Sequence, residues 1–292
     1  MRCLSPILIK NARGEIMRVS CKQCISCRLN RSQEWTIRLM DELKDRDYAV
    51  FLTLTYDDEH LPRVSDEYAT LDYKDVQLYW KRVRKALGKD YRIRYYVCGE
   101  YGTKFGRPHY HAIVYCDFNN CVSGMRLQFE RRLQEVLRMF WSYGFVYFGD
   151  VNPRSCAYVA RYCVKLLTGK ASKYYSERNI RPEFARQSRR PGIAGEHVHK
   201  FAEEYRRFKC KRWKGKDVAL PRFYKDKTYE EMDRIFERAS LAVADALKIK
   251  KFQQRIKDVG IAQASKEDYE SEIQEELNLL SRFSLGKRNK IK

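Results

Sequence analysis

The chain has 292 residues, of which 44% are apolar, so it can form a packed core and wholesale disorder is excluded. Its 59 Lys and Arg against 38 Asp and Glu give a formal charge of +21, which a polyanionic partner explains better than any requirement of the fold. No stretch approaches the roughly 18 consecutive apolar residues that span a bilayer, and the first residues hold too short an apolar run for a secretory signal, so we expect neither an integral membrane protein nor a secreted one.

Four of the ten cysteines lie near the N-terminus, at Cys3, Cys21, Cys24 and Cys27. The C-x2-C-x2-C spacing, with Cys3 available from a distance, is typical of a structural zinc site with four thiolates. Two other interpretations stay open. The thiols can be reduced and unligated, or they can hold an iron–sulfur cluster, although the usual fourth cysteine followed by proline is absent after Cys27.

Apolar periodicity predicts alternating helices and strands through the middle of the chain. In chain order we expect a helix at 29–43, a strand at 49–56, a helix at 72–87, strands at 92–98 and 109–115, a helix at 125–141, a strand at 145–151 and a helix at 156–167. The loop GEYGTKFGRP between the two central strands contains three glycines and a proline.

These elements predict an α+β fold with a central antiparallel sheet, flanking helices and a helical C-terminal extension. We place a Cys-rich N-terminal segment and helix at 1–47, the sheet domain at 48–170 and a basic, mostly helical region at 171–292. Residues 170–227 contain 18 basic and 7 acidic side chains with interleaved aromatic residues. That mixture favours contact with single-stranded DNA over a merely solvated surface, because bases stack on rings and phosphates pair with cations. The candidate DNA-binding residues are Arg189, Arg190, Arg206, Arg207, Lys211, Arg212 and Trp213.

A pair of histidines, His109 and His111, leads into the apolar run AIVY. Residues i and i+2 of a strand point to the same face, so both imidazoles can bind one metal ion. Glu100 ends the preceding apolar run and supplies a third ligand if the two strands are neighbours. Two imidazoles and a carboxylate with open positions suit Mg²⁺ or Mn²⁺ that also holds a substrate phosphate. A second pair, His197 and His199, has no such strand around it, and we do not expect it to be catalytic.

The predicted helix YVARYCVK places Tyr158, Tyr162 and Lys165 on one stripe, at i, i+4 and i+7. One interpretation is an ordinary amphipathic helix whose tyrosines pack against the sheet. The other is that a tyrosine attacks a phosphodiester and forms a covalent phosphotyrosine. A free phenol has a pKa of about 10, so a nearby metal ion or Lys165 would have to lower it.

Taken together, the strand FLTLTY, the His-x-His strand with an upstream glutamate and the tyrosine helix resemble the three motifs of HUH rolling-circle replication initiators. The phrases CGEYGTKFGRPHYHAIVY, YVARYCVK and RQSRRPGIAGEH are similar to the initiators of gokushovirus-type microviruses, which are small single-stranded DNA phages. The resemblance covers roughly residues 20–200.

The resemblance implies a metal-dependent endonuclease and strand transferase with an RNA-recognition-like sheet. His109, His111 and Glu100 would be the metal ligands, Tyr162 in its Y-x-x-K context the nucleophile, and Tyr158 the second tyrosine. Such an enzyme nicks single-stranded origin DNA in the host bacterial cytoplasm, stays attached to the 5′ phosphate, and leaves a 3′ hydroxyl for a host DNA polymerase, with a host helicase. Which tyrosine attacks first stays open.

Two alternatives keep the same residues. A relaxase or single-strand transposase would use the same motifs on a transfer origin or a transposon end. A non-catalytic nucleic-acid-binding protein would show salt-sensitive binding with no metal requirement and no covalent product. A membrane-surface protein is disfavoured, because the basic residues are not gathered beside a long apolar helical face.

Overall fold

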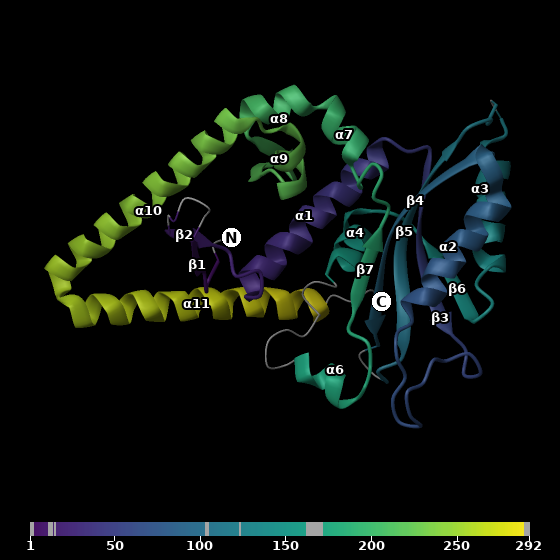
Figure 1. The fold of residues 1–292 in the computed structure, drawn as a ribbon, viewed down its shortest axis with the longest axis horizontal. Helices are drawn as coiled ribbons and strands as arrows, with labels where there is room; N and C mark the ends of the chain where they lie inside the picture. Colours follow the sequence, from purple (N-terminus) through teal and green to yellow (C-terminus); the bar gives the residue numbers. More distant parts are fainter. Residues whose placement is uncertain are drawn as a thin grey trace. The chain divides into compact units, whose positions relative to one another are not determined.

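The structure is a computed structural model that describes residues 3–10, 14, 16–102, 105–122, 124–161 and 172–288. The chain forms two compact units, which are coloured by sequence in Figure 1. The terminal unit contains Met1–Asn30, Ala202–Lys211 and Arg222–Lys292, and the sheet unit contains Arg31–Phe201 and Arg212–Pro221.

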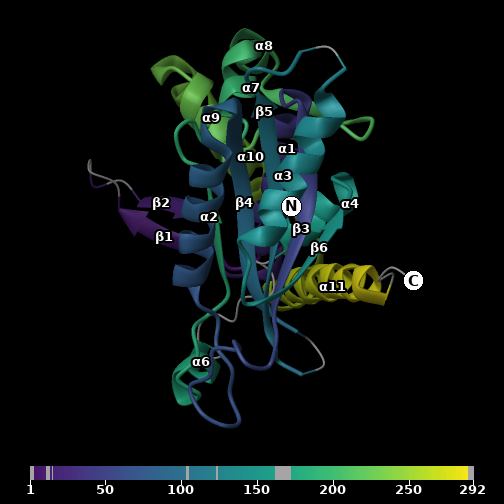
Figure 2. The ribbon, with the colours of Figure 1, turned by 90° about the vertical axis from the view of Figure 1, so that its right-hand side faces the viewer.

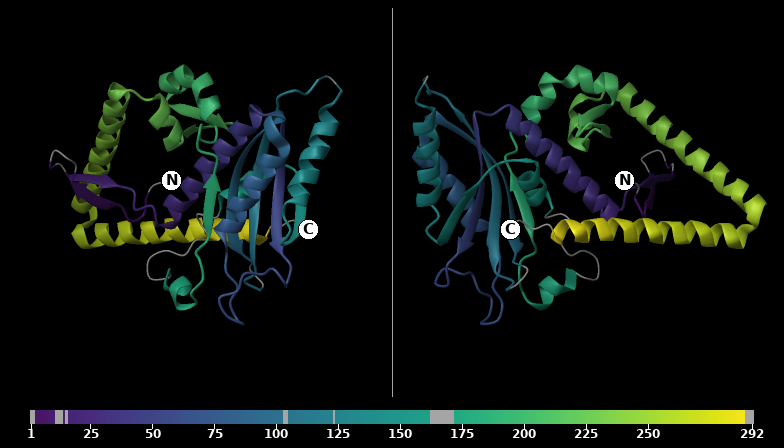
Figure 3. Two further views of the ribbon diagram at one scale, coloured as in Figure 1. Left: turned by 45° about the vertical axis from the view of Figure 1, so that its right-hand side comes forward. Right: turned by 180° about the vertical axis from the view of Figure 1, so that it is seen from behind.

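The sheet unit is built on a five-stranded antiparallel sheet with the strand order β6-β3-β5-β4-β7. The strands are β3 (Tyr48–Tyr56), β4 (Tyr91–Tyr101), β5 (Pro108–Phe118), β6 (Gly144–Gly149) and β7 (Phe184–Gln187). The first four confirm the strands predicted from apolar periodicity. The left view of Figure 3 shows β7 at the edge of the sheet, so the sheet takes one strand from beyond residue 170.

Helices cover both faces of this sheet, as Figure 2 shows from the side of α2 and α3. The helices are α1 (Ile25–Lys44), α2 (Tyr73–Leu87), α3 (Arg126–Met139), α4 (Pro153–Ala160), α6 (Lys173–Glu177) and α7 (Gly195–Lys200), with a short 3₁₀ turn at Gly88–Asp90. Buried side chains of α2 and α3 form one core with one face of the sheet, and those of α4 and residues 31–44 of α1 form a second core with the other.

Strict alternation along β3 separates these two cores. Leu52 and Leu54 are buried in the core under α2 and α3, whereas Phe51 packs against the core under α1 and α4. Successive side chains of a strand point to opposite faces, so Thr53 shares the face of Phe51. The polar residues of the sheet are therefore gathered under α4, where the candidate site lies.

Helix α4 begins three residues earlier than predicted because Asn152 caps it. The Asn152 side chain accepts hydrogen bonds from the N–H groups of Arg154 and Ser155, and Pro153 occupies the first helical turn. Both features are preferred helix starts. The predicted end of this helix, at residue 167, lies outside the described residues.

A buried charge network holds α1, β4 and the turn before α7 together. The Glu42 carboxylate accepts hydrogen bonds from Arg46 at 2.8 Å, from Arg94 at 2.5 Å and from the N–H of Ala194 at 2.5 Å. Arg46 also pairs with Glu196 at 2.7 Å. Such a network is costly to break, because removing one partner leaves a buried charge uncompensated.

The terminal unit begins with the antiparallel pair β1 (Ile7–Lys10) and β2 (Ile16–Val19). Its other elements are α8 (Ala202–Phe208), α9 (Arg222–Thr228), α10 (Glu231–Val259) and α11 (Ile261–Arg288). Gly260, with φ +82°, ends α10, since a left-handed backbone favours glycine at a helix C-terminus. The short strands β8 (Cys210–Trp213) and β9 (Lys216–Ala219) complete the structure, so residues 171–292 supply three strands besides their helices. Among the described helices, none combines the length and the apolar character that crossing a membrane requires.

Candidate active site

The register of three neighbouring strands gathers a carboxylate and two imidazoles on one face of the sheet. Glu100 of β4 is directly opposite His109 of β5, and His111 of β5 is directly opposite Thr53 of β3. His109 and His111 are two residues apart and therefore share a face. The neighbouring strands that the sequence analysis required for Glu100 are present.

The three side chains point at a common position. The Glu100 Oε1 atom is 3.3 Å from His109 Nε2 and 3.4 Å from His111 Nε2. One ligand atom from each residue lies within 4.8 Å of the others. The Glu100 side chain is only 3% exposed, and the His109 and His111 side chains are 17% and 10% exposed. A nearly buried carboxylate between two imidazoles is a donor set that suits a divalent cation.

Hydrogen bonds behind the imidazoles fix how the rings face the site. His109 Nδ1 is 3.0 Å from the carbonyl oxygen of Arg107, and since a carbonyl only accepts, Nδ1 carries a proton. The lone pair of neutral His109 is then on Nε2, which faces Glu100. His111 Nδ1 is 2.9 Å from the Thr53 hydroxyl. Partners of this kind orient metal-binding histidines.

Gly99 lets the strand carrying Glu100 pack closely. A Cβ atom built at Gly99 would lie 2.9 Å from Leu71, 3.0 Å from Phe184 and 3.1 Å from Tyr110. All three are side-chain atoms on the face of the sheet opposite to Glu100, so only glycine fits there without displacing its neighbours.

Helix α4 brings a tyrosine hydroxyl to the same position. The Tyr158 O–H donates to Glu100 Oε1 at 2.7 Å and lies 3.3 Å from His111 Nε2. The Tyr158 ring meets the His111 ring edge to face, with centroids 4.9 Å apart. Cys156, Val159 and Ala160 anchor α4 in the core, so the phenol is held by a rigid element.

The surroundings of Tyr158 keep its phenol protonated in the absence of a cation. Burial raises its pKa well above the ordinary value, and the negative charge of Glu100 raises it further. A positive charge beside the oxygen would reverse the second effect, because an opposite charge favours the ionised form. Activation of this phenol therefore calls for a cation at the Glu100, His109 and His111 cluster.

Comparison with known proteins places the chain in a family. Residues 49–167 match the family model of the replication-associated protein ORF2. Replication-associated protein VP4 of Bdellovibrio phage phiMH2K is 32% identical over 253 residues, which cover 77% of this chain and 76% of that protein. The chain belongs to the family of replication-associated proteins of microvirus-type phages. The resemblance to rolling-circle initiators seen in the motifs is thus confirmed.

Two other relatives in this family are similar over shorter shares. Replication-associated protein ORF2 of Spiroplasma virus 4 is 33% identical over 189 residues, 60% of this chain and 56% of that protein. Replication-associated protein ORF4 of Chlamydia phage 1 is 26% identical over 215 residues, 70% of this chain and 52% of that protein. No solved structure matches the chain.

The tyrosine pair of this family member is only half described. Tyr158 lies at the cluster, whereas Tyr162 and Lys165 fall within residues 162–171, outside the described residues. Thr53, the hydrogen-bond partner of His111, was not named as a site residue. Alternation along β3 does place Thr53 on the face of the histidines, and this was the available signal.

The second histidine pair lies on a helix, not on a strand. His197 and His199 belong to α7, where residues two apart point in different directions. His197 is buried against Asp45, at 3.0 Å, and Asp41, at 3.5 Å, while His199 is exposed. Within the described part of the chain, neither takes part in a three-residue metal-ligand cluster.

The four N-terminal cysteines converge within the terminal unit. Cys3 Sγ is 3.5 Å from Cys21 Sγ and 3.9 Å from Cys24 Sγ, and with Cys27 all four sulfurs lie within 4.8 Å of one another. Burial opposes ionisation of Cys21, but hydrogen bonds from the N–H groups of Cys24 and Gln23 lower its pKa to about 7. Thiolates and not thiols bind metals, so this environment favours a ligand.

The predicted DNA-binding residues occupy different environments. Arg189 and Arg190 are exposed, and they line a pocket of the sheet unit. Lys211 is buried and donates to the Tyr205 hydroxyl at 3.0 Å. Ion pairs engage Arg206, with Glu230 and Asp233, and Arg212, with Asp217; Arg207 is exposed and Trp213 is half-buried.

Proposed function

We propose that this protein is a metal-dependent, site-specific endonuclease and strand transferase for single-stranded DNA. It nicks the replication origin of a small phage genome through a 5′-phosphotyrosine intermediate and initiates rolling-circle replication. The observation that carries the proposal is the convergence of the Tyr158 hydroxyl on Glu100, which also lies between His109 and His111. Family membership favours replication over the relaxase and transposase alternatives.

In this proposal the sheet unit is an HUH endonuclease domain. The antiparallel sheet, the paired histidines on its central strand and the tyrosine helix above them support that assignment. The protein acts in the cytoplasm of the bacterial host, where a helicase and a DNA polymerase of the host extend the freed end.

The donor set fits Mg²⁺ or Mn²⁺. Glu100 supplies an oxygen, His109 and His111 supply nitrogens, and the exposed side of the cluster leaves room for a phosphate oxygen. When bound there, the cation polarises the scissile phosphate and offsets its developing charge. Thr53 and the Arg107 carbonyl keep the imidazoles turned toward the cluster.

The chain itself supplies the nucleophile and its orientation. The Tyr158 phenol gives up its proton, and its oxygen forms a bond to phosphorus while the bond from phosphorus to the 3′ oxygen breaks. The leaving 3′ oxygen takes up a proton, so the step consumes no water and conserves the phosphodiester bond energy. The 3′ hydroxyl then primes synthesis. A second tyrosine, Tyr162, can repeat the nick after one round while the first end is still held.

The test is a denaturing gel of the protein with labelled single-stranded fragments that tile the genome encoding it, with and without Mn²⁺. We expect an SDS-resistant protein–DNA adduct with one fragment only, and only with the metal. Folded protein that binds DNA in a salt-sensitive way but forms no adduct with any fragment would instead establish the non-catalytic binding protein.

We also propose that Cys3, Cys21, Cys24 and Cys27 hold a structural Zn²⁺. Sulfur atoms at the corners of a tetrahedral zinc site are separated by roughly 3.8 Å, given Zn–S bonds of about 2.3 Å. The separations of 3.5 and 3.9 Å from Cys3 to Cys21 and Cys24 lie near that value. The site would tie β1 and β2 to the start of α1, in a region with few buried apolar side chains.

Metal analysis of the purified, reduced protein tests the zinc site. We expect one zinc per chain in wild type, and its loss together with a lower melting temperature in Cys24→Ser. Cys121→Ser, which changes another partly exposed free cysteine, is the matched control and should keep the zinc. Reduced protein without zinc, or protein with the visible absorption of an iron–sulfur cluster, would contradict this assignment.

A further inference from the structure

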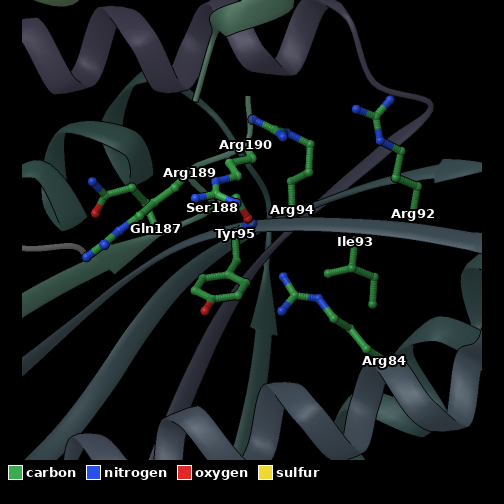
Figure 4. A pocket seen from close by; sticks show the side chains of 9 residues that line it. All are labelled: Arg84, Arg92, Ile93, Arg94, Tyr95, Gln187, Ser188, Arg189 and Arg190. Atoms are coloured by element: carbon green, nitrogen blue, oxygen red, sulfur yellow. The ribbon is translucent and has the colours of Figure 1, made fainter. Parts of the chain in front are cut away.

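A pocket of the sheet unit, distant from the tyrosine site, is lined by arginines from three segments. It has a volume of about 370 Å³ and lies where β7 ends and leaves an edge of β4 uncovered. Figure 4 shows side chains reaching it from α2, from β4 and from the residues after β7. The lining residues are Arg84, Arg92, Ile93, Arg94, Tyr95, Gln187, Ser188, Arg189 and Arg190.

Three of the five arginines are uncompensated. Arg94 pairs with Glu42, and Arg92 pairs with Glu196 at 2.5 Å. Arg84, Arg189 and Arg190 are exposed, and in the described ranges of the chain none of them has a carboxylate within ion-pair distance. No Asp or Glu lines the pocket. Guanidinium groups gathered in this way repel one another, and an anion removes that repulsion.

The pocket is preformed by its own supports. The buried Arg94 guanidinium donates to the carbonyls of Pro191 at 2.8 Å and Gly192 at 3.0 Å, which fixes the turn that presents Arg189 and Arg190. Ser188 and Tyr95 hold the beginning of that turn through two hydrogen bonds, at 2.9 and 3.1 Å.

The remaining arginine is positioned by an aromatic stack. The Arg84 guanidinium lies over the Tyr95 ring, 5.2 Å from its centroid, and the Tyr95 ring stacks on Trp80 at 4.3 Å. Arginines held in place before binding lose less entropy when they bind a ligand.

We propose that this pocket binds backbone phosphates of the single strand that the enzyme nicks, at a distance from the scissile bond. This inference rests on the proposed function for the identity of its ligand. Guanidinium groups match phosphate geometry and carry no base information, so the contact positions the strand without reading its sequence. The flexible backbone of a single strand can enter a concave pocket, whereas the phosphates of a duplex lie on a stiff convex surface.

Strand geometry separates this pocket from the catalytic cluster. Tyr95 and Glu100 are five residues apart on β4, which corresponds to about 17 Å at roughly 3.3 Å per residue. Removal of the arginines should therefore weaken DNA binding without changing the chemistry at Tyr158, and a short oligonucleotide that covers only the nick should be cleaved as by wild type.

The test compares two triple variants of equal charge. Arg84→Gln with Arg189→Gln and Arg190→Gln removes the uncompensated arginines, and Arg131→Gln with Arg132→Gln and Arg138→Gln removes three exposed arginines of α3. Affinity for a labelled long oligothymidine is measured over a range of salt concentrations. For the pocket variant we expect roughly tenfold weaker binding at low salt, and a salt slope about 2 smaller because each lost phosphate contact removes about 0.7. The α3 variant should keep the wild-type slope.

Each outcome bears on one proposal. Equal affinity and slope in the two triple variants, with melting temperatures matching wild type, would overturn the pocket. A weaker pocket variant together with wild-type protein that forms no adduct with any genome fragment would leave the pocket standing and remove the nicking function. Arg84→Glu serves as a second variant if the triple variant does not fold, and it should weaken binding to the same oligothymidine.

Discussion

Replacing both histidines, His109→Ala with His111→Ala, is expected to reduce the rate of adduct formation by about a thousandfold or more, since a catalytic cation contributes several kcal/mol and each 1.4 kcal/mol is tenfold. DNA affinity should change little, because phosphate contacts are spread over many basic residues far from the cluster. The measurement is single-turnover adduct formation at saturating Mn²⁺, with Mn²⁺ binding followed separately by electron paramagnetic resonance.

The chain offers a matched control for the histidine variant. His199→Ala removes an exposed imidazole of α7 outside the cluster and should leave both cleavage and Mn²⁺ binding unchanged. Normal cleavage by the double variant would show that the cation binds elsewhere. Retained Mn²⁺ binding with lost cleavage would assign the two imidazoles to the reaction and not to metal binding.

The catalytic cluster was predictable because it depends on local patterns that a sheet preserves. Residues i and i+2 of β5 share a face whatever surrounds them, and a short connection makes β4 and β5 antiparallel neighbours. Glu100 then comes opposite His109 with no information from distant parts of the chain. The Thr53 contact with His111 needed one thing more, the register between β3 and β5, which the sequence alone does not fix.

The arginine pocket could not be predicted for the opposite reason. It depends on β7, whose four residues FARQ have no apolar alternation, pairing with the edge of β4. Only that pairing brings Arg189 and Arg190 beside Arg84, more than 100 positions earlier in the chain. The basic composition of residues 170–227 predicted DNA contact but not which cations are available for it. Lys211 is buried on Tyr205, and Arg206 is paired with Asp233.

The tyrosines show where a motif and the geometry emphasise different residues. The Y-x-x-K context points to Tyr162, whereas the described structure places the Tyr158 hydroxyl on Glu100. Helical spacing put Tyr158 and Tyr162 on one stripe but could not say which turn of the helix meets the sheet. The position of α4 decides that for Tyr158, because the Asn152 cap and the buried Cys156 set where the helix begins and which side faces β5.

Tyr158→Phe is accordingly expected to reduce the first cleavage by about a thousandfold, since it removes the attacking oxygen and leaves only background chemistry. Tyr162→Phe should still form the first adduct and fail in a second nick that releases the circle. Tyr147→Phe, at an exposed position of β6, is the matched control and should behave as wild type. Single-turnover gels give the rates, and mass spectrometry of the digested adduct identifies the modified tyrosine.

The pH dependence of the wild-type rate supplies an independent check on the same residue. Burial and the Glu100 charge raise the pKa of Tyr158, and only the phenolate attacks, so the rate of first cleavage should rise with pH up to the pKa that the bound cation sets. The Glu100→Gln variant, which removes the negative charge beside the phenol and one metal ligand, should shift that profile. A wild-type adduct rate in Tyr158→Phe with DNA on Tyr162 would assign the first attack to Tyr162, and the contact with Glu100 would then belong to the second.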